Sequence, residues 1–265
     1  MNQTVFQSSP VREPASEPVF VFGCRVKNDP LTEGAAAAAA RFHGAIPSVW
    51  AGPNGNAYGV GCRGTQGQLL SHDVLEGYIA EFIQYARNNP NRRFRIARFG
   101  CDKGEYDDVE MAELWRGLPK NCVLPALWQR AFGILNGVRI LVFDPLDRLR
   151  SDEWRARFRD YIATSMPLWG VDTCTLISAM SAPRSTDSVG SLAKELGMLH
   201  REVRADPQYY GQQAPVVSEM LGVWHSTHLL CLTEPSQTAI PSHVRLLNYA
   251  ERDGLCIDDL QASKS

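Results

Sequence analysis

The sequence lacks a long apolar run, a paired-cysteine motif and a strong excess of charge of either sign. No stretch approaches the roughly 18 consecutive apolar residues of a membrane-spanning helix. Its seven cysteines are scattered and contain no CxxC pair, which argues against a zinc site. The formal net charge is -2, so no general basic field favours nucleic acid. We therefore expect no nucleic-acid partner, no membrane, no metal and no bound cofactor.

The first 17 residues also lack features of a targeting segment. They are polar, include Glu13 and contain no apolar core of a secretory signal. Their serine, proline and glutamine content is typical of a loose tail. Unpaired cysteines in apolar surroundings, such as Cys231, fit a reducing compartment. These features predict a cytoplasmic protein.

The composition that remains is that of a globular chain, with 44% hydrophobic and 21% charged residues. Its length allows two domains, and apolar runs alternate with helical patterns, which predicts an α/β fold. We expect a tail over 1–17 and two three-layer α/β domains over 18–135 and 137–260, the second with a parallel Rossmann-like sheet. The expected strands are 19–22, 46–50, 92–99, 138–143, 173–178, 199–203 and 224–232. The expected helices begin near residues 34, 71, 107, 152, 188 and 240.

Residues 19–45 are the strongest candidate for a binding element. An apolar strand ends at Gly23, a polar loop containing Arg25 follows, and Gly34 opens a run of six alanines. A strand that leads through a loop to a helix N-terminus can hold an anion, because free backbone N–H groups and the helix dipole converge there. The alternative is a small-residue helix packed tightly on the sheet, with nothing bound.

Two further glycine-rich passages lie at 51–67 and 100–104. We expect the glycines near positions 23, 59–61 and 100–104 to form three loops at one sheet edge, where ligands bind in α/β folds. A surface loop, or a strand edge over 56–61, is the alternative for the middle passage. Arg93, Arg95 and Arg98 are expected on a solvated face, and the acidic run 105–110 in a solvated first helical turn. His225 and His228 are expected on opposite faces of one strand, which excludes them as a metal pair.

The motifs of the first half carry a family resemblance over residues 18–130. The chain reads VFVFG, then an alanine-rich helix ending in HGA, then FRIARFGC. It resembles uncharacterised bacterial and phage proteins with an FGSN-type loop and a GCGxAG-type loop, which are similar to macrodomain-like ADP-ribose-binding modules. Cys24 and Arg25 replace the Ser-Asn pair, and residues 102–105 replace the small Gly-Leu-Ala-Gly run, which weakens a catalytic reading. The resemblance implies ligand contacts at Gly23, Cys24, Arg25, Gly34, Tyr58, Gly59, Gly61, Gly100, Cys101 and Asp102.

The second half resembles the SLOG superfamily of Rossmann-like nucleotide-binding domains. Residues 181–187, SAPRSTD, stand in the place of that family's GGARGAD segment, and residues 210–220 in the place of its Pro-to-Met segment. Residues 236–238 replace its Gly-Thr turn. The resemblance implies ligand contacts at Arg184, Ser185, Asp187, Ser236 and Thr238. The missing glycines leave open a scaffold that no longer binds, since only glycine lets the backbone approach a phosphate so closely.

Both resemblances imply a nucleotide-derived ligand, either ADP-ribose-like or a cyclic nucleotide. The poverty of identifiable acid–base residues favours binding over turnover, and no catalytic residue is assigned. A concrete version is a phage-encoded sponge that sequesters an antiviral nucleotide signal in the host cytoplasm, as a homo-oligomer. One alternative is a hydrolase or transferase acting on NAD or ADP-ribose through Asp102, Glu105 or a loop cysteine. Another is a structural protein with vestigial pockets.

Overall fold

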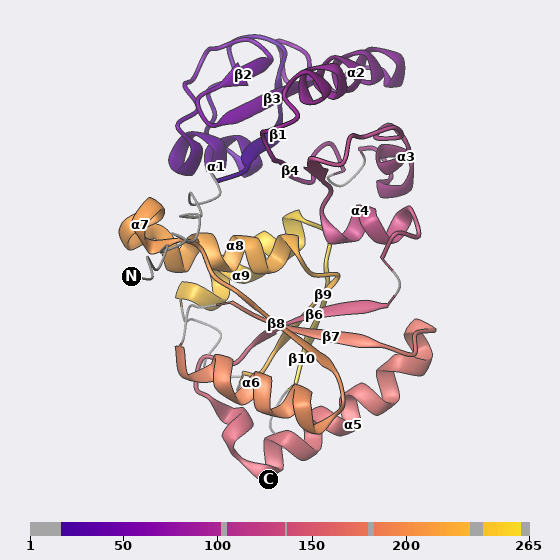
Figure 1. The fold of residues 1–265 in the computed structure, drawn as a ribbon, viewed down its shortest axis with the longest axis vertical. Helices are drawn as coiled ribbons and strands as arrows, with labels where there is room; N and C mark the ends of the chain where they lie inside the picture. The colour runs from indigo at the N-terminus through magenta and orange to yellow at the C-terminus, as the bar shows by residue number, and fades with distance from the viewer. Residues whose placement is uncertain (1–16, 102–104, 136, 180–182, 234–240, 261–265) are drawn as a thin grey trace, which may run out of the picture.

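The chain forms two five-stranded sheets, each covered by helices on both faces (Figure 1). The structure is a computed structural model, and it describes residues 17–101, 105–135, 137–179, 183–233 and 241–260. The expected α/β class with two three-layer parts is confirmed. We call the part built on the sheet of β1–β5 the first unit and the part built on the sheet of β6–β10 the second unit.

The first sheet has the strand order β2-β3-β1-β4-β5. All neighbours are parallel except β2 and β3, so the carboxyl ends of β3, β1, β4 and β5 share one edge. Its elements are β1 (Val19–Arg25), α1 (Gly34–His43), β2 (Gly52–Asn54), β3 (Ala57–Arg63), α2 (His72–Asn88), β4 (Phe94–Ile96), α3 (Asp108–Glu113), β5 (Cys122–Val123) and α4 (Ala126–Ala131).

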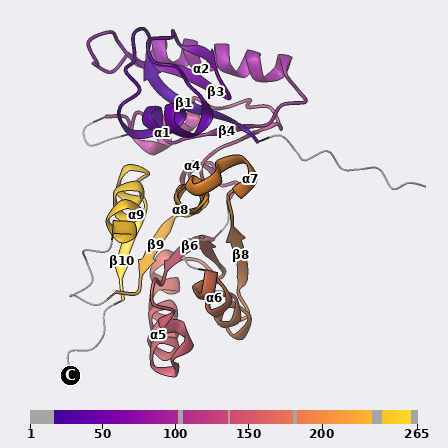
Figure 2. The same ribbon diagram turned by 90° about the vertical axis from the view of Figure 1, so that its left-hand side faces the viewer.

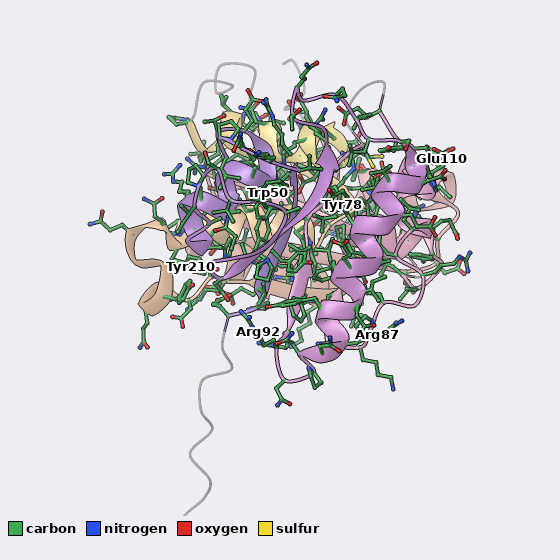
Figure 3. The ribbon with its side chains drawn as sticks, turned by 90° about the horizontal axis from the view of Figure 1, so that it is seen from above. Trp50, Tyr78, Arg87, Arg92, Glu110 and Tyr210 are labelled. Carbon is green, nitrogen blue, oxygen red and sulfur yellow. The ribbon has the colours of Figure 1, made fainter. Side chains whose placement is uncertain are left out.

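The central strand β1 is buried on both faces, as a nearly continuous apolar run requires. Phe20 and Phe22 face the alanines of α1, while Val19 and Val21 face the cluster that includes α2. Helix α2 lies across that second face (Figure 3). It buries Leu75, Ile79, Phe82, Ile83 and Ala86, which confirms the helical spacing expected from the sequence.

The second sheet is fully parallel, with the order β10-β9-β6-β7-β8. This is a doubly wound, Rossmann-like arrangement. Helices α5 and α6 cover one face, and α8 and α9 cover the other (Figure 2). Its elements are β6 (Val138–Phe143), α5 (Asp152–Trp169), β7 (Cys174–Ala179), α6 (Pro183–Glu195), β8 (Leu199–Val203), α7 (Pro207–Tyr210), α8 (Ala214–Trp224), β9 (His228–Cys231), α9 (Pro241–Arg252) and β10 (Cys256–Asp259), with short 3-10 turns at Arg148–Arg150 and Gly211–Gln213.

Helix α8 packs against both sheets and joins the two units. A methyl group on Gly222 would lie only 3.0 Å from the Leu141 side chain of the second sheet, so glycine allows the close approach. Trp224 Nε1 donates a 2.6 Å hydrogen bond to the carbonyl oxygen of Ile96 in the first sheet. Met220 packs in the cluster formed by α1 and β1. A helix that is apolar on most sides is typical of such a doubly buried position.

The structure corrects two expectations in the first half. The strand expected over 46–50 is absent from those residues, where Ser48 has φ 64, and strand β2 begins at Gly52 instead. Gly23, Gly59 and Gly61 lie inside β1 and β3 rather than in loops. A methyl group on Gly59 would lie 2.8 Å from Cys24 Sγ, so this glycine serves tight packing between strands.

In the second half, the strand expected over 224–232 is shorter than predicted. Trp224 ends helix α8, and the strand begins at His228. Helix α8 and strand β10 were not expected. Continuous burial of α8 removes the polar stripe by which a helix is recognised in a sequence. Within the described residues, no helix is both long and apolar enough to cross a bilayer.

Candidate anion-binding site

A cavity of about 90 Å³ opens at the carboxyl edge of the first sheet. It lies where β1 and β3 end, beside the segment that follows β4 and the first turn of α1. Gly23 and Gly100, both among the expected contacts, line it. The remaining described lining residues are Ala35, Cys62, Arg63, Arg98, Phe99 and Arg252.

The two glycines are required by their surroundings. A methyl group on Gly23 would lie 2.6 Å from Phe99 Cγ and 2.7 Å from Cys62 Sγ, so any side chain there would displace the cavity wall. Gly100 has φ +71, and a methyl group on it would lie 2.8 Å from Met111 Cε. Glycine therefore allows both the left-handed turn and the close packing beneath the cavity.

Three arginines reach the cavity from three different elements. Arg63 ends β3, Arg98 follows β4, and Arg252 ends α9 of the second unit. Glu105, Asp108 and Asp253 respectively form ion pairs with them. None of these three carboxylates is among the described lining residues. These three ion pairs hold the arginine side chains in place at the cavity.

Arg98 is the most constrained of the three. It donates to both carboxylate oxygens of Asp108, at 2.8 and 2.9 Å, and to the carbonyl oxygens of Cys101 and Arg252 at 2.7 and 2.5 Å. Burial opposes its charge, but the hydrogen bond and charge of Asp108 leave its pKa above the ordinary value. The expected solvated position of Arg98 is wrong, because its side chain is only 8% exposed. Because Arg252 belongs to the second unit, the hydrogen bond from Arg98 to its carbonyl oxygen joins the two units at the cavity.

The N-terminus of α1 adds backbone N–H groups to the same place. The side chain of its capping residue, Glu33, makes no hydrogen bond to the helix, and the first N–H groups of a helix have no partner within it. Asp29 fixes the preceding loop by accepting hydrogen bonds from the N–H groups of Arg25 and Leu31, at 2.7 and 2.8 Å. Ala35 of the first turn then lines the cavity.

The nearby thiols are poor nucleophiles. Burial raises the pKa of Cys62 to about 12 and raises that of Cys24 further. Both are therefore protonated near neutral pH, and the thiolate is the reactive form. Cys101 is also buried, with its Sγ 3.6 Å from the carbonyl oxygen of Phe99. All three thiols are therefore packed in the protein interior, and Cys62 forms part of the cavity wall.

Several residues expected at the site lie elsewhere in the first unit. Tyr58 packs against Phe82 of α2, with ring centroids 5.0 Å apart, and burial raises its pKa to about 12. Cys24, Gly59 and Gly61 are packed within the sheet. The Arg25 guanidinium lies beside Gly67. Gly34 adjoins Arg252, and Asp102 lies outside the described residues.

The arginines are the residues that the sequence analysis missed. Arg63 ends β3, and Arg98 comes two residues after β4. This position at the end of a parallel strand was a usable signal for the carboxyl edge. Arg252 offered no such signal, because it reaches the cavity from another unit, more than 150 residues after Arg98 in the chain.

The expected site of the second unit is only partly described. Arg184 and Ser185 lie in the first turn of α6, outside the described side chains, and Asp187 is exposed. Ser236 and Thr238 lie outside the described residues.

No metal centre is formed by the described residues: none of their histidine, cysteine, aspartate and glutamate side chains cluster in groups of three or more. His225 caps α8 and His228 begins β9, so the two do not share a strand as expected. All seven cysteines are free. Comparison with protein family models, with curated proteins and with solved structures finds no match for this chain.

Proposed function

We propose that the first unit binds a phosphate group of a nucleotide-derived, ADP-ribose-like ligand in the arginine-lined cavity. One observation carries this proposal: three arginines and the first turn of α1 line one cavity, and no carboxylate is among its described lining residues. Guanidinium groups hold phosphate oxygens through charge-assisted, often paired, hydrogen bonds. A helix N-terminus adds N–H donors of the same polarity.

The size of the cavity restricts which part of the ligand it holds. A volume of about 90 Å³ has room for several waters or for a single tetrahedral anion. A nucleoside would lie outside the cavity, over its mouth. Because Cys24 and Cys62 are protonated near neutral pH, the chemistry favours retention of the ligand over its turnover. Sequestration of a nucleotide signal in the cytoplasm, as by a phage-encoded sponge, is the biological role we propose.

Calorimetric titration with ADP-ribose and with adenosine tests this proposal. We expect saturable binding of ADP-ribose, with weaker binding of adenosine, which lacks phosphate. Arg63→Gln should weaken ADP-ribose binding by at least about tenfold, since a hydrogen bond to a charged group is worth about 1.5–3 kcal/mol. Arg116→Gln is the matched control, because Arg116 is an exposed arginine that also pairs with a glutamate.

Two results would contradict the proposal. One is equal affinity for adenosine and ADP-ribose, which would remove the role of phosphate. The other is an equal loss of affinity in Arg63→Gln and Arg116→Gln, which would indicate a general charge effect. Mass spectrometry of the ligand after binding separates the alternatives: intact ADP-ribose supports sequestration, and a cleaved product supports an enzyme.

A further inference from the structure

A second group of basic residues lies between the two units, away from the arginine-lined cavity. It consists of Arg95 on β4, Arg139 on β6, Arg201 on β8 and His225 at the end of α8. We call these four residues the seam cluster. Arg95 comes from the first unit, and the other three come from the second. None of the four lines the cavity proposed above.

The strand register places Arg139 and Arg201 on the same face of the second sheet. Arg201 pairs with Ile177, which pairs with Leu141 on the next strand. Arg139 lies two residues before Leu141, so its side chain points to the same side. Leu141 and Val203, two residues from Arg201, belong to the cluster packed under α8 and α9. Both arginines therefore face the layer that α8 occupies.

Helix α8 brings His225 and the first unit to this face. The N–H of Thr227 donates to the Arg139 carbonyl oxygen at 2.9 Å, and the Arg139 N–H donates to Thr227 Oγ1 at 3.0 Å. His225 precedes Thr227 by two residues, so these hydrogen bonds hold it close to the Arg139 backbone. The neighbouring Trp224 ring lies 4.6 Å from the His225 ring and donates to the residue after Arg95.

No ion pair to a described carboxylate balances these arginines: none is formed by Arg95, Arg139 or Arg201. Burial, followed by the charge of Arg201, lowers the pKa of Arg139. Burial, followed by the charges of Arg201, Arg95 and Arg139, lowers the pKa of His225 to about 3.

Two acidic residues near these elements form ion pairs with other arginines. Glu202 points to the opposite face of β8 and pairs with Arg204. Asp253 lines the same small pocket as Arg95 but pairs with Arg252. Arg95 and Arg139 are partly buried and Arg201 is exposed; three like charges gathered in this way repel one another, and a bound anion would offset that repulsion.

We propose that the seam cluster binds a small polyvalent phosphate anion, either inorganic or the phosphate chain of a nucleotide. Such an anion would bridge Arg95 of the first unit to Arg139 and Arg201 of the second, and would stabilise the contact between the units. The site takes the same chemistry as the cavity, but it is built from different residues. It stands whether or not the cavity binds a ligand.

The test is titration of the full-length protein with inorganic pyrophosphate at constant ionic strength, followed by NMR of the histidine rings. The His225→Gln variant identifies the His225 signals. We expect a saturable shift of these signals, because an anion bound beside the His225 ring changes the electric field at the ring. Arg201→Gln should weaken this binding about tenfold. Arg204→Gln is the matched control, since Arg204 is exposed, lies next to the same strand and pairs with Glu202.

Arg63→Gln separates this proposal from the cavity, and should leave the His225 response unchanged. ATP in place of pyrophosphate distinguishes the source of the phosphate: tighter binding of ATP indicates a nucleotide, and tighter binding of pyrophosphate indicates an inorganic anion. The proposal is overturned if the His225 signals show no saturable response, or if Arg201→Gln and Arg204→Gln weaken binding equally. Loss of the response in Arg63→Gln would also overturn it. Circular dichroism confirms that each variant is folded.

Discussion

Replacing Arg98 should destabilise the first unit more than any other change of a single arginine. Its side chain is 8% exposed and makes two hydrogen bonds to Asp108 and one each to two carbonyl oxygens. Removing one partner of a buried ion pair costs about 3–5 kcal/mol. Asp108 is 27% exposed and keeps a 2.7 Å hydrogen bond from Trp128 Nε1, so we expect the lower end for Arg98→Gln, about 3 kcal/mol.

Urea unfolding followed by circular dichroism and by tryptophan fluorescence measures this change. Arg98→Lys keeps the charge but loses the paired geometry, so its loss should be smaller than that of Arg98→Gln. The double variant with Asp108→Asn should be less destabilised than the sum of the single variants, with a coupling of about 1–3 kcal/mol. If the two units unfold in separate urea transitions, the transition of the first unit should move to a lower urea concentration.

The reasoning is refuted if Arg98→Gln changes the free energy of unfolding by less than about 1 kcal/mol, the usual limit for an exposed pair. It is also refuted if the effects of Arg98→Gln and Asp108→Asn are additive, since contacting residues in one network should couple. Either result would mean that Arg98 is solvated, as the sequence alone suggested.

Three further predictions concern packing, thiol reactivity and pH. Gly23→Ala should lower the free energy of unfolding in urea by about 1–3 kcal/mol, because the added methyl group meets the cavity wall. An unchanged midpoint of the urea transition would disprove this close approach. Cys256 is exposed and Cys62 is buried, so a disulfide reagent should label Cys256 first in the native protein. Peptide mass spectrometry would identify the labelled residue, and early labelling of Cys62 would contradict its burial and raised pKa. Burial lowers the pKa of His43 from 6.5 to about 3. Between these values the unfolded chain binds a proton that the folded chain does not. The free energy of unfolding should therefore fall as the pH drops below 6.5, by about 1.4 kcal/mol per pH unit for each such histidine. His43→Phe should reduce this slope by one proton.

Local pattern was enough to predict much of the fold. The period of α2 and the apolar run of β1 depend on residues close together in the sequence, and both elements form where expected. Gly100 lies in a loop, as expected. The loop expected at Gly23 and at Gly59 was wrong, and the strand alternative over 56–61 holds. A glycine that makes room for Cys24 within a strand has the same local pattern as one that forms a loop. The difference depends on a neighbouring strand, which the local sequence does not specify.

The candidate site was predicted only where it lies next to a strand end. Gly23 lies near the end of β1 and Gly100 follows β4, and both reach the cavity because these two strands are parallel neighbours. Arg252 reaches it through the contact between the units, where Arg98 donates to its carbonyl oxygen. A sequence pattern carries no information on such a contact, because it is set by the docking of α8 and α9 against the first sheet.

The most direct test of the central claim is mass spectrometry of the small molecules released when the purified protein is denatured. The account predicts an intact, phosphate-bearing, nucleotide-derived compound, recovered in proportion to the protein and lost in Arg63→Gln. Recovery of no such compound from wild-type protein, together with no binding of added ADP-ribose, would contradict it. Equal recovery from wild-type and Arg63→Gln protein would place the ligand away from the cavity.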